Sequence, residues 1–288
     1  MVKNLANTPV REATWSADNE RLDRALTRMN LVRSRSQAGT QIASGKVQIN
    51  GVIASKPSAI VKSGDLVAVQ SGDEYVSRAA NKLLHALDEF AIDVRNTFAL
   101  DVGASTGGFT QVLLERGASR VVALDVGHDQ LDTQLRADSR VQVIEGCNAR
   151  ELSRELFAQL TSSQDLPEII VCDVSFISLT LLLGRLAQLA SPKTSIVLLV
   201  KPQFEVGRTG IKSGIVVDPA LARDAVIRVI DAASSFGLQC QGVTESPITG
   251  QHGNREVLCF FTSAPDRVSD TREWNHYVAK LFGTGGAT

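Results

Sequence analysis

The sequence predicts an α/β protein in which a mostly parallel sheet follows a small, basic α+β domain. Its 288 residues suit about two domains, and 43% hydrophobic with 21% charged residues is an ordinary globular composition. From Ser77 onward, helical patterns alternate with short β-branched runs, which is typical of a parallel sheet. Residues 20–62 contain 8 basic and 2 acidic residues, whereas residues 75–288 contain 20 basic and 24 acidic residues. This uneven charge predicts that the small domain contacts a polyanion.

The chain is expected to divide into five parts. These are a tail at 1–18, the small domain at 19–72, a linker at 73–78, the α/β domain at 79–265, and a C-terminal helix or tail at 266–288. The first part is polar and irregular, and Ser71-Gly72-Asp73 is a run of turn-forming residues. The sequence suggests no function for the last part.

Several classes of protein fit the sequence poorly. The most apolar region, 179–200, contains Arg185 and Lys193, so it is a poor membrane span. The N-terminus lacks the apolar segment of a signal peptide, and we expect a cytoplasmic protein with no membrane partner. The cysteines form no Cys-x-x-Cys pair and have no histidine at metal-ligand spacing, so we expect reduced thiols and no metal. They are Cys147, Cys172, Cys240 and Cys259.

Two helices and three strands are predicted in the small domain. Apolar residues recur at helical spacing in 21–30, and Ser34 and Gly45 suit the start and end of a second helix. Asn50-Gly51 favours a two-residue hairpin turn between two strands in 46–55. A last strand is predicted at 65–70.

The motifs of this domain, R-L-D, S-R-x-x-A, I-x-x-G-K-V and I-N-G-V, resemble the S-four type of RNA-binding module. The residues that match are Arg21, Leu22, Asp23, Ser34, Arg35, Gly45, Val47, Asn50 and Gly51. In that family the helices and the following loop present basic side chains to folded RNA. The resemblance implies RNA contacts from Arg21, Arg24, Arg33, Arg35, Lys46 and Asn50.

Continuous apolar runs predict five buried strands in the α/β domain. They are 97–102, 120–126, 140–146, 168–174 and 195–201. Helical patterns occur at 77–90, 109–117, 179–190 and 219–236. Two later runs, 238–248 and 254–263, are candidates for a closing pair of antiparallel strands.

A glycine-rich loop, L-D-V-G-A-S-T-G-G-F-T at 100–110, follows the first of these strands. Its glycines allow a sharp turn, and the next helix offers free N–H groups to a ligand. The run is not the G-x-G-x-x-G of nicotinamide-binding sites, which argues against a dehydrogenase. Its D-x-G-x-S-x-G spacing resembles the nucleoside-binding loop of S-adenosylmethionine-dependent methyltransferases, with Ser105 in place of the middle glycine. A glycine-rich turn without a ligand is the alternative.

That resemblance implies S-adenosyl-L-methionine as cofactor. Asp125 lies at the end of the second strand, where nucleoside-binding sheets place a carboxylate for ribose hydroxyls, although it could be an ordinary turn former. Asn148 resembles the family position that contacts adenine, and Asp173 is expected near the methionine end. The implied set is Asp101, Gly103, Ala104, Ser105, Thr106, Gly107, Gly108, Asp125, Asn148 and Asp173.

Four charged residues form a second candidate group. Asp173 and Lys201 each lie at the end of a predicted strand, so both are expected at the carboxyl edge of the sheet. Lys82 lies on the preceding helix, where simple exposure is the alternative, and Glu256 lies in an apolar strand, where a charge needs a partner or a sheet edge. The four resemble the Lys-Asp-Lys-Glu tetrad of the FtsJ-like 2′-O-ribose methyltransferases.

The resemblance extends over most of the chain, through V-S-R-A-A-N-K-L, A-L-D-V-G-H-D-Q-L, C-D-V-S-F-I-S-L, V-K-P-Q-F-E-V-G-R and G-N-R-E-V-L-C-F-F. The sequence is identified as a member of the TlyA family of rRNA 2′-O-methyltransferases, historically labelled hemolysins. His128 and Asp129 depart from residues common in relatives. Membership implies a Rossmann-like S-adenosylmethionine-dependent methyltransferase sheet with a small N-terminal α+β RNA-binding domain.

The family implies methylation of a ribose 2′-hydroxyl, a cytidine target, and ribosomal RNA within ribosomal subunits as partner. Lys201 is the expected ammonium that stabilises the developing oxyanion, Asp173 and Glu256 hold the lysines, and Lys82 completes the group. Base methylation is disfavoured, because D-V-S-F stands where an N-P-P-Y-type loop is needed and there is no Pro-Cys pair. A non-catalytic RNA-binding ribosome assembly factor is an alternative, and a pore-forming hemolysin is a weaker one.

Overall fold

The computed structural model describes residues 10–32, 35–70, 75–207, 210–250, 253–263 and 271–283. The chain forms two compact units, Met1–Glu74 and Tyr75–Thr288, and each has a hydrophobic core of its own. Within the described residues, no helix is long and apolar enough to cross a membrane. The predicted turn at 71–73 and the predicted helix start at Ser34 lie outside those residues.

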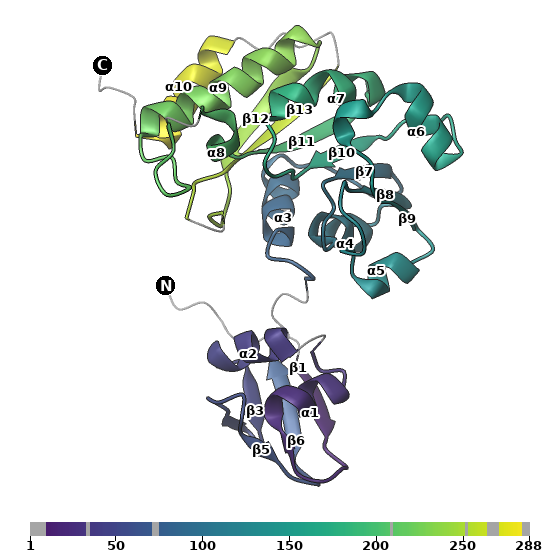
Figure 1. Ribbon diagram of the computed structural model, residues 1–288, viewed down its shortest axis with the longest axis vertical. Coiled ribbons are helices and arrows are strands. Elements are labelled where there is room, and N and C mark those ends of the chain that lie inside the picture. The colour runs from purple at the N-terminus through teal and green to yellow at the C-terminus, as the bar shows by residue number, and fades with distance from the viewer. Residues whose placement is uncertain are drawn as a thin grey trace. The chain divides into compact units, whose positions relative to one another are not determined.

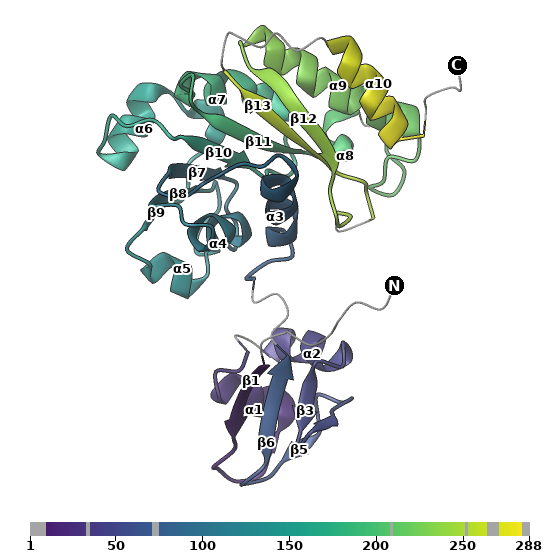
Figure 2. The ribbon, with the colours of Figure 1, turned by 180° about the vertical axis from the view of Figure 1, so that it is seen from behind.

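The small unit is an antiparallel sheet with helix α1 packed on one face (Figure 1, Figure 2). Its strand order is β1-β6-β3-β4, and β2 and β5 form a separate pair. The elements are β1 Val10–Thr14, β2 Glu20–Arg21, α1 Leu22–Arg28, α2 Arg35–Ala43, β3 Val47–Ile49, β4 Val52–Ile53, β5 Ile60–Val61 and β6 Leu66–Gln70. Leu26 and Ile42 of the helices pack against Val47 and Val67 of the sheet in its core.

Two details of the small unit bear on the sequence predictions. Asn50 and Gly51 join β3 to β4 with φ of 50° and 81°, so the predicted hairpin is confirmed. Residues 10–14, expected as part of an irregular tail, instead form β1 and pair antiparallel with β6. β1 is an edge strand with mostly exposed side chains, so it lacks the apolar alternation that identifies a half-buried strand.

The large unit contains a seven-stranded sheet with strand order β12-β13-β11-β10-β7-β8-β9. Its strands are β7 Phe98–Val102, β8 Arg120–Leu124, β9 Val141–Ile144, β10 Ile169–Cys172, β11 Ser195–Val200, β12 Gln239–Glu245 and β13 Val257–Thr262. β13 pairs antiparallel with β11 and β12, whereas the strands from β7 to β11 pair in parallel. The five predicted parallel strands and the antiparallel closing pair are therefore confirmed.

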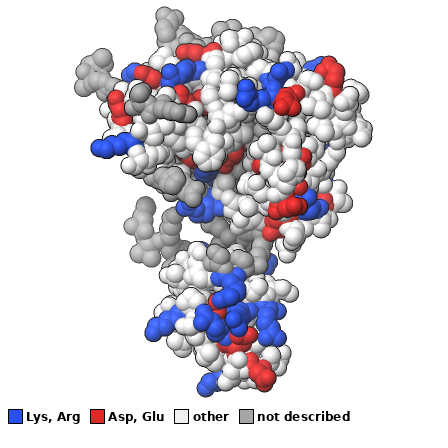
Figure 3. All heavy atoms as spheres, viewed as in Figure 1, with Lys and Arg blue, Asp and Glu red and all other residues white. Residues whose placement is uncertain are grey.

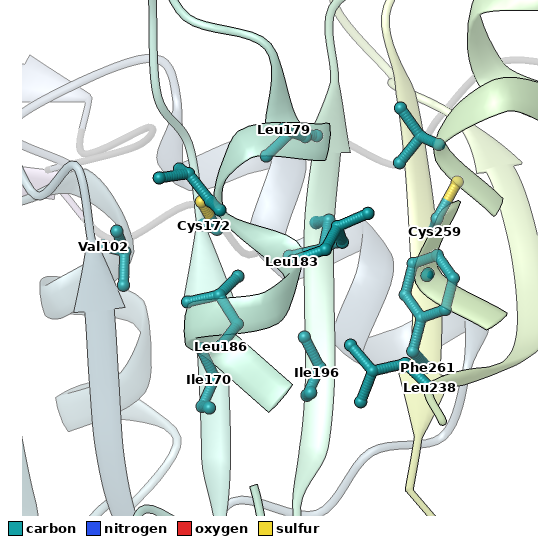
Figure 4. Close-up of a cluster of buried hydrophobic side chains, with 14 of the residues drawn as sticks. Val102, Ile170, Cys172, Leu179, Leu183, Leu186, Ile196, Leu238, Cys259 and Phe261 are labelled. Carbon is teal, nitrogen blue, oxygen red and sulfur yellow. The ribbon is translucent and has the colours of Figure 1, made fainter. Parts of the chain in front are cut away.

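Helices cover both faces of this sheet (Figure 1). One core includes residues of α6 Arg154–Thr161, α7 Leu183–Leu189, α9 Pro219–Ser235 and α10 Thr271–Leu281, and the other includes residues of α3 Ala80–Glu89, α4 Gly108–Glu115 and α5 Thr133–Ala137. Leu100 of β7 belongs to the first core and Ala99 to the second, because successive side chains of a strand face opposite ways. Figure 4 shows the first core, where Ile170 and Ile196 lie beside Leu186 of α7.

The strand order reverses beside β7. The chain runs from β7 to β8 and β9 on one side and then returns to β10 and β11 on the other. Doubly wound sheets bind ligands outside the carboxyl ends of the strands at such a reversal. The loops that follow β7, β8, β10 and β11 contain most of the predicted site residues, and this topology brings them to one edge.

Candidate active site

The glycine-rich loop leaves β7 in a conformation that favours glycine. Gly103 has a φ of +84°, and a Cβ built there would lie 2.6 Å from the backbone oxygen of Asp173. The N–H groups of Gly103 and Ala104 both donate to the carbonyl oxygen of Leu124, at 2.8 and 3.1 Å. The loop is thereby held between the ends of β8 and β10, and its bare backbone leaves room for a ligand.

Two predicted cofactor-binding residues support this loop from within the fold. Asp101 is 0% exposed, and its Oδ2 accepts a hydrogen bond of 2.7 Å from the Thr110 hydroxyl. Burial raises the pKa of Asp101 to about 7. Gly107 has a φ of +96° at the start of α4, where a Cβ would collide with Leu131 and Leu135. Both residues shape the loop without lining the cavities that the described residues form around it.

Two adjoining cavities lie over the carboxyl ends of β7, β8 and β10. The larger, of about 720 Å³, is lined by five of the predicted cofactor residues: Gly103, Ser105, Asp125, Asn148 and Asp173. The smaller, of about 310 Å³, shares three of these and adds Ala104, Thr106 and Gly108. We call this pair of cavities the cofactor cavities.

Asp125 holds the loop through both of its carboxylate oxygens. They accept hydrogen bonds from the backbone N–H groups of Ser105, at 2.8 Å, and Gly127, at 2.7 Å. A carboxylate has about four acceptor positions, so each oxygen can also accept a hydrogen bond from a ligand hydroxyl. Ser105 has a φ of +48°, a left-handed conformation that favours glycine, which fits the prediction that this serine stands in place of a glycine.

The four charged residues of the predicted tetrad meet as two ion pairs. Lys201 Nζ, directly after β11, lies 2.6 Å from Oδ1 of Asp173, directly after β10. Lys82 Nζ, on α3, lies 2.5 Å from Oε2 of Glu256, directly before β13. Both pairs are buried, with side-chain exposures of 3% to 14%. The burial excludes the alternative of an exposed Lys82, and Glu256 has the partner that a charge in an apolar strand requires.

A third cavity, of about 450 Å³, is lined by three members of the tetrad, Lys82, Lys201 and Glu256. We call it the tetrad cavity. Ser175 lines both this cavity and the two cofactor cavities, so it marks the place where they adjoin. The geometry therefore puts two buried ion pairs next to a glycine-lined pocket, at the position where a ligand group from one cavity could meet one from the other.

The sequence prediction missed several residues of this site. Lys201 Nζ donates a hydrogen bond of 2.8 Å to Ser175 Oγ. Phe176 is 91% exposed, and its ring centroid lies 5.2 Å from that of Phe204. Arg78 lines the tetrad cavity one helical turn before Lys82. The first three of these neighbours occur in the D-V-S-F and K-P-Q-F-E motifs, but sequence does not distinguish a phenylalanine at a cavity from one in a core.

The predicted RNA-binding residues lie on the small unit, where Figure 3 shows basic side chains gathered around α1. Arg21 Nε lies 3.0 Å from Asp23 Oδ1, and Arg35 Nη2 lies 2.8 Å from Oδ2. The hydrogen bond from Arg21 is the main cause that lowers the pKa of Asp23 to about 2. The side chains of Arg21 and Arg35 stay 43% and 58% exposed, so neither ion pair buries its arginine.

The other RNA-binding candidates are in different surroundings. Arg24 lies 3.9 Å from Glu20, and Lys46 lies between α2 and β3. The Asn50 amide donates to Asp65 and accepts from the Leu66 N–H, so its side chain stabilises the hairpin region. The remaining candidate, Arg33, lies outside the described residues.

The cysteines and the possible metal-binding side chains bear on the prediction of reduced thiols and no metal. The four cysteines are free, and Cys147 lines the larger cofactor cavity. In the part of the chain that the structure describes, no three His, Cys, Asp or Glu side chains are arranged to hold a metal ion.

The sheet, its glycine loop and the paired lysines and acids fit the class of protein that the sequence predicted, the FtsJ-like methyltransferases. Residues 75–262 match the model of that family, and residues 20–67 match that of the S4 domain. Relatives that match over most of the chain then show to which family within this class it belongs.

The 16S/23S rRNA (cytidine-2′-O)-methyltransferase TlyA of Mycobacterium tuberculosis is 42% identical over 272 residues, which cover 93% of this chain and 99% of that protein. Hemolysin A of Brachyspira hyodysenteriae is 40% identical over 84% of this chain and 99% of its own length. A solved structure of a hemolysin-named protein from Streptococcus thermophilus has a TM-score of 0.70 and 36% identity, covering 93% of this chain and 97% of that one. The chain belongs to the TlyA family of FtsJ-like methyltransferases.

Proposed function

We propose that this protein transfers a methyl group from S-adenosyl-L-methionine to the 2′-hydroxyl of a cytidine in ribosomal RNA. The observation that supports this most is the position of the Lys201–Asp173 ion pair, because Lys201 lines both the smaller cofactor cavity and the tetrad cavity. The substrate class follows from the relative in Mycobacterium tuberculosis, which is named a cytidine-2′-O-methyltransferase of 16S and 23S rRNA. With a ribosomal substrate, the reaction would occur in the cytoplasm.

The residues around Gly103 fit this cofactor. Gly103 lines both cofactor cavities, and without a side chain its backbone is open to a ligand there. Asp125 would accept hydrogen bonds from the cofactor's ribose hydroxyls, and Asn148 would lie near its adenine in the same cavity. When bound, S-adenosyl-L-methionine supplies a methyl group that its sulfonium already activates.

The protein then has to align the ribose hydroxyl and stabilise the charge that develops on it. A ribose hydroxyl is a weak acid, and negative charge develops on its oxygen as its proton leaves to water. The new bond from that oxygen to the methyl carbon then removes the charge. The Lys201 ammonium stabilises that oxygen in a site largely shielded from water, where a fixed charge acts strongly. Asp173 and Glu256 offset the cost of burying the two lysines and hold them in place.

The small unit would dock the protein on folded rRNA. Arg21 and Arg35 are exposed guanidinium groups, and Arg24 and Lys46 add to the positive charge of the same unit. On the large unit, Arg78 lines the tetrad cavity, and no carboxylate of the described residues pairs with it. It would contact a phosphate next to the target ribose.

The test is a single-turnover reaction of purified protein with ribosomal subunits and labelled cofactor, followed by mapping of the methylated nucleotide. We expect 2′-O-methylcytidine from the wild type and at least roughly a 100-fold lower rate from Lys201→Ala, the scale for losing one oxyanion-stabilising donor. Lys201→Arg should also be slow, because a planar guanidinium differs in shape from an ammonium. Lys193→Ala is the matched control, since it removes an exposed lysine just before β11, at the opposite edge of the sheet.

The possible results separate the alternatives. A methylated base would overturn the ribose assignment. Wild-type protein that binds rRNA tightly without transferring a methyl group would instead support an assembly factor. A rate near that of the wild type in Lys201→Ala would exclude Lys201 and make Lys82 the next candidate for the ammonium.

A further inference from the structure

Ser175 lies on the loop after β10, two residues beyond Asp173, and is exposed. It lines the tetrad cavity and both cofactor cavities. Its Oγ accepts a hydrogen bond of 2.8 Å from Lys201 Nζ. A serine at the junction of three cavities thus contacts the lysine that faces the proposed reaction.

The three contacts of Lys201 Nζ have different effects on the ammonium group: two act on its charge and one sets its orientation. Asp173 Oδ1, at 2.6 Å, neutralises the charge, and the Phe204 ring, with its centroid at 5.9 Å, gives a weaker attraction. Asp173 Oδ1 has no hydrogen-bond partner among the described residues, so its contact with Nζ is an ion pair without hydrogen-bond geometry. The hydrogen bond to Ser175 is directional, so it sets the rotation of the ammonium about the Cε–Nζ bond. An ammonium has three N–H groups, and fixing one of them directs the other two.

The loop that holds Ser175 is itself tied at both ends. At its start, the Asp173 N–H donates to the carbonyl oxygen of Val102 at 3.0 Å. At its end, the Glu205 carboxylate accepts from the Ser178 hydroxyl at 2.5 Å and from the Leu179 N–H at 2.7 Å. Glu205 ends α8, the short helix Pro202–Glu205 that begins next to Lys201. The loop and the lysine are therefore fixed to the same segment.

We propose that Ser175 is a positioning residue of the methyl transfer, which holds the Lys201 ammonium so that an N–H group faces the 2′-oxygen of the ribose. This inference rests on the proposed function, because it assigns Ser175 a role through Lys201. A flexible lysine without this hydrogen bond would keep its charge in the site but would spend less time in the orientation that stabilises the oxyanion. Ser175 therefore affects the rate of transfer more than the binding of RNA or cofactor.

The experiment measures single-turnover methylation of ribosomal subunits at saturating RNA and cofactor. Ser175→Ala should lower the rate by roughly 10-fold or more, the scale of a hydrogen bond to a charged group. Ser175→Thr retains a hydroxyl and should recover most of the rate. Ser119→Ala is the matched control, because it removes an exposed serine hydroxyl with one backbone hydrogen bond, 3.0 Å to Thr97, directly before β8.

Cofactor affinity, measured by calorimetry, and the thermal unfolding midpoint should stay near wild type in Ser175→Ala. These measurements are needed because Ser175 also lines the cofactor cavities. A rate loss that follows weaker cofactor binding and disappears at saturation would overturn the proposal.

A double-mutant cycle separates this inference from the proposed function. If Ser175 acts through Lys201, Ser175→Ala should cause no further loss in a Lys201→Ala background. An equal fold-loss in both backgrounds would overturn the positioning role. Loss of rate in Lys201→Ala with none in Ser175→Ala would overturn this inference alone, whereas a wild-type rate in Lys201→Ala would overturn the catalytic assignment on which it rests.

Discussion

Replacing Gly103 by alanine should damage the site through the backbone of Asp173. The new Cβ would lie 2.6 Å from the Asp173 carbonyl oxygen, whereas ordinary contacts begin near 3.4 Å, so the two segments would have to separate by about 0.8 Å. Asp173 is the ion-pair partner of Lys201, and a misplacement of about 1 Å can cost roughly 100-fold in rate. The left-handed φ of +84° adds roughly 1–2 kcal/mol of strain for a residue with a Cβ.

The assay compares Gly103→Ala with Gly237→Ala. Gly237 has a similar φ of +78°, but a Cβ built there would have nothing within 4 Å, so its substitution gives the strain without the collision. We expect both variants to unfold at lower denaturant concentration, and only Gly103→Ala to lose single-turnover rate, by roughly 10- to 100-fold. Equal rates for the two variants would refute the argument that close packing of Gly103 on Asp173 sets the site geometry.

Three further predictions follow from described contacts. Asp125→Ala should weaken cofactor binding about tenfold or more, because hydrogen bonds to a charged group contribute about 1.5–3 kcal/mol each; unchanged affinity by calorimetry would remove Asp125 from the site. Arg78→Ala should reduce the slope of log affinity for rRNA against log salt by roughly 0.7–0.9, one phosphate contact, while Lys193→Ala leaves the slope unchanged. Asp101 has a folded pKa of about 7 against an ordinary 3.8, so the folded state binds the extra proton, and the free energy of unfolding should fall as pH rises from about 4 to about 7. Asp101→Asn should remove that fall in denaturant titrations, and an unaltered pH dependence would contradict the buried, protonated carboxyl.

The sheet of the large unit was predictable because its strands are buried on both faces. Runs such as 195–201 and 168–174 are largely apolar, and the charged residue that follows each strand marks the carboxyl edge of the sheet. That rule alone places Asp173 and Lys201 at one edge. β1 could not be found in the same way, since an exposed edge strand has no apolar pattern and depends on pairing with β6, at the far end of the small unit's sequence.

The pairing of the tetrad and its immediate neighbours needed the structure. Sequence order does not tell which lysine contacts which acid, because that depends on how α3 and the segment before β13 approach each other in space. The hydrogen bond from Lys201 to Ser175 depends on the path of the loop after β10, and an exposed serine has no signature of its own. The sequence also could not show that Asp101 supports the loop from within the fold. The sequence pattern of a strand residue before a glycine loop is the same whether its side chain is buried or lines the cavity.

The Lys82–Glu256 ion pair joins residues 174 positions apart. During synthesis, Lys82 leaves the ribosome early, and nearly the whole large unit is made before its partner Glu256 emerges. A chain that stops before Glu256 already has the sequence of the small unit, the glycine loop, Asp173 and Lys201, but it lacks β13, the strand that pairs with both β11 and β12. The large sheet and the Lys82–Glu256 pair are therefore completed by the same late segment, so the site is finished only when β13 takes its place in the sheet.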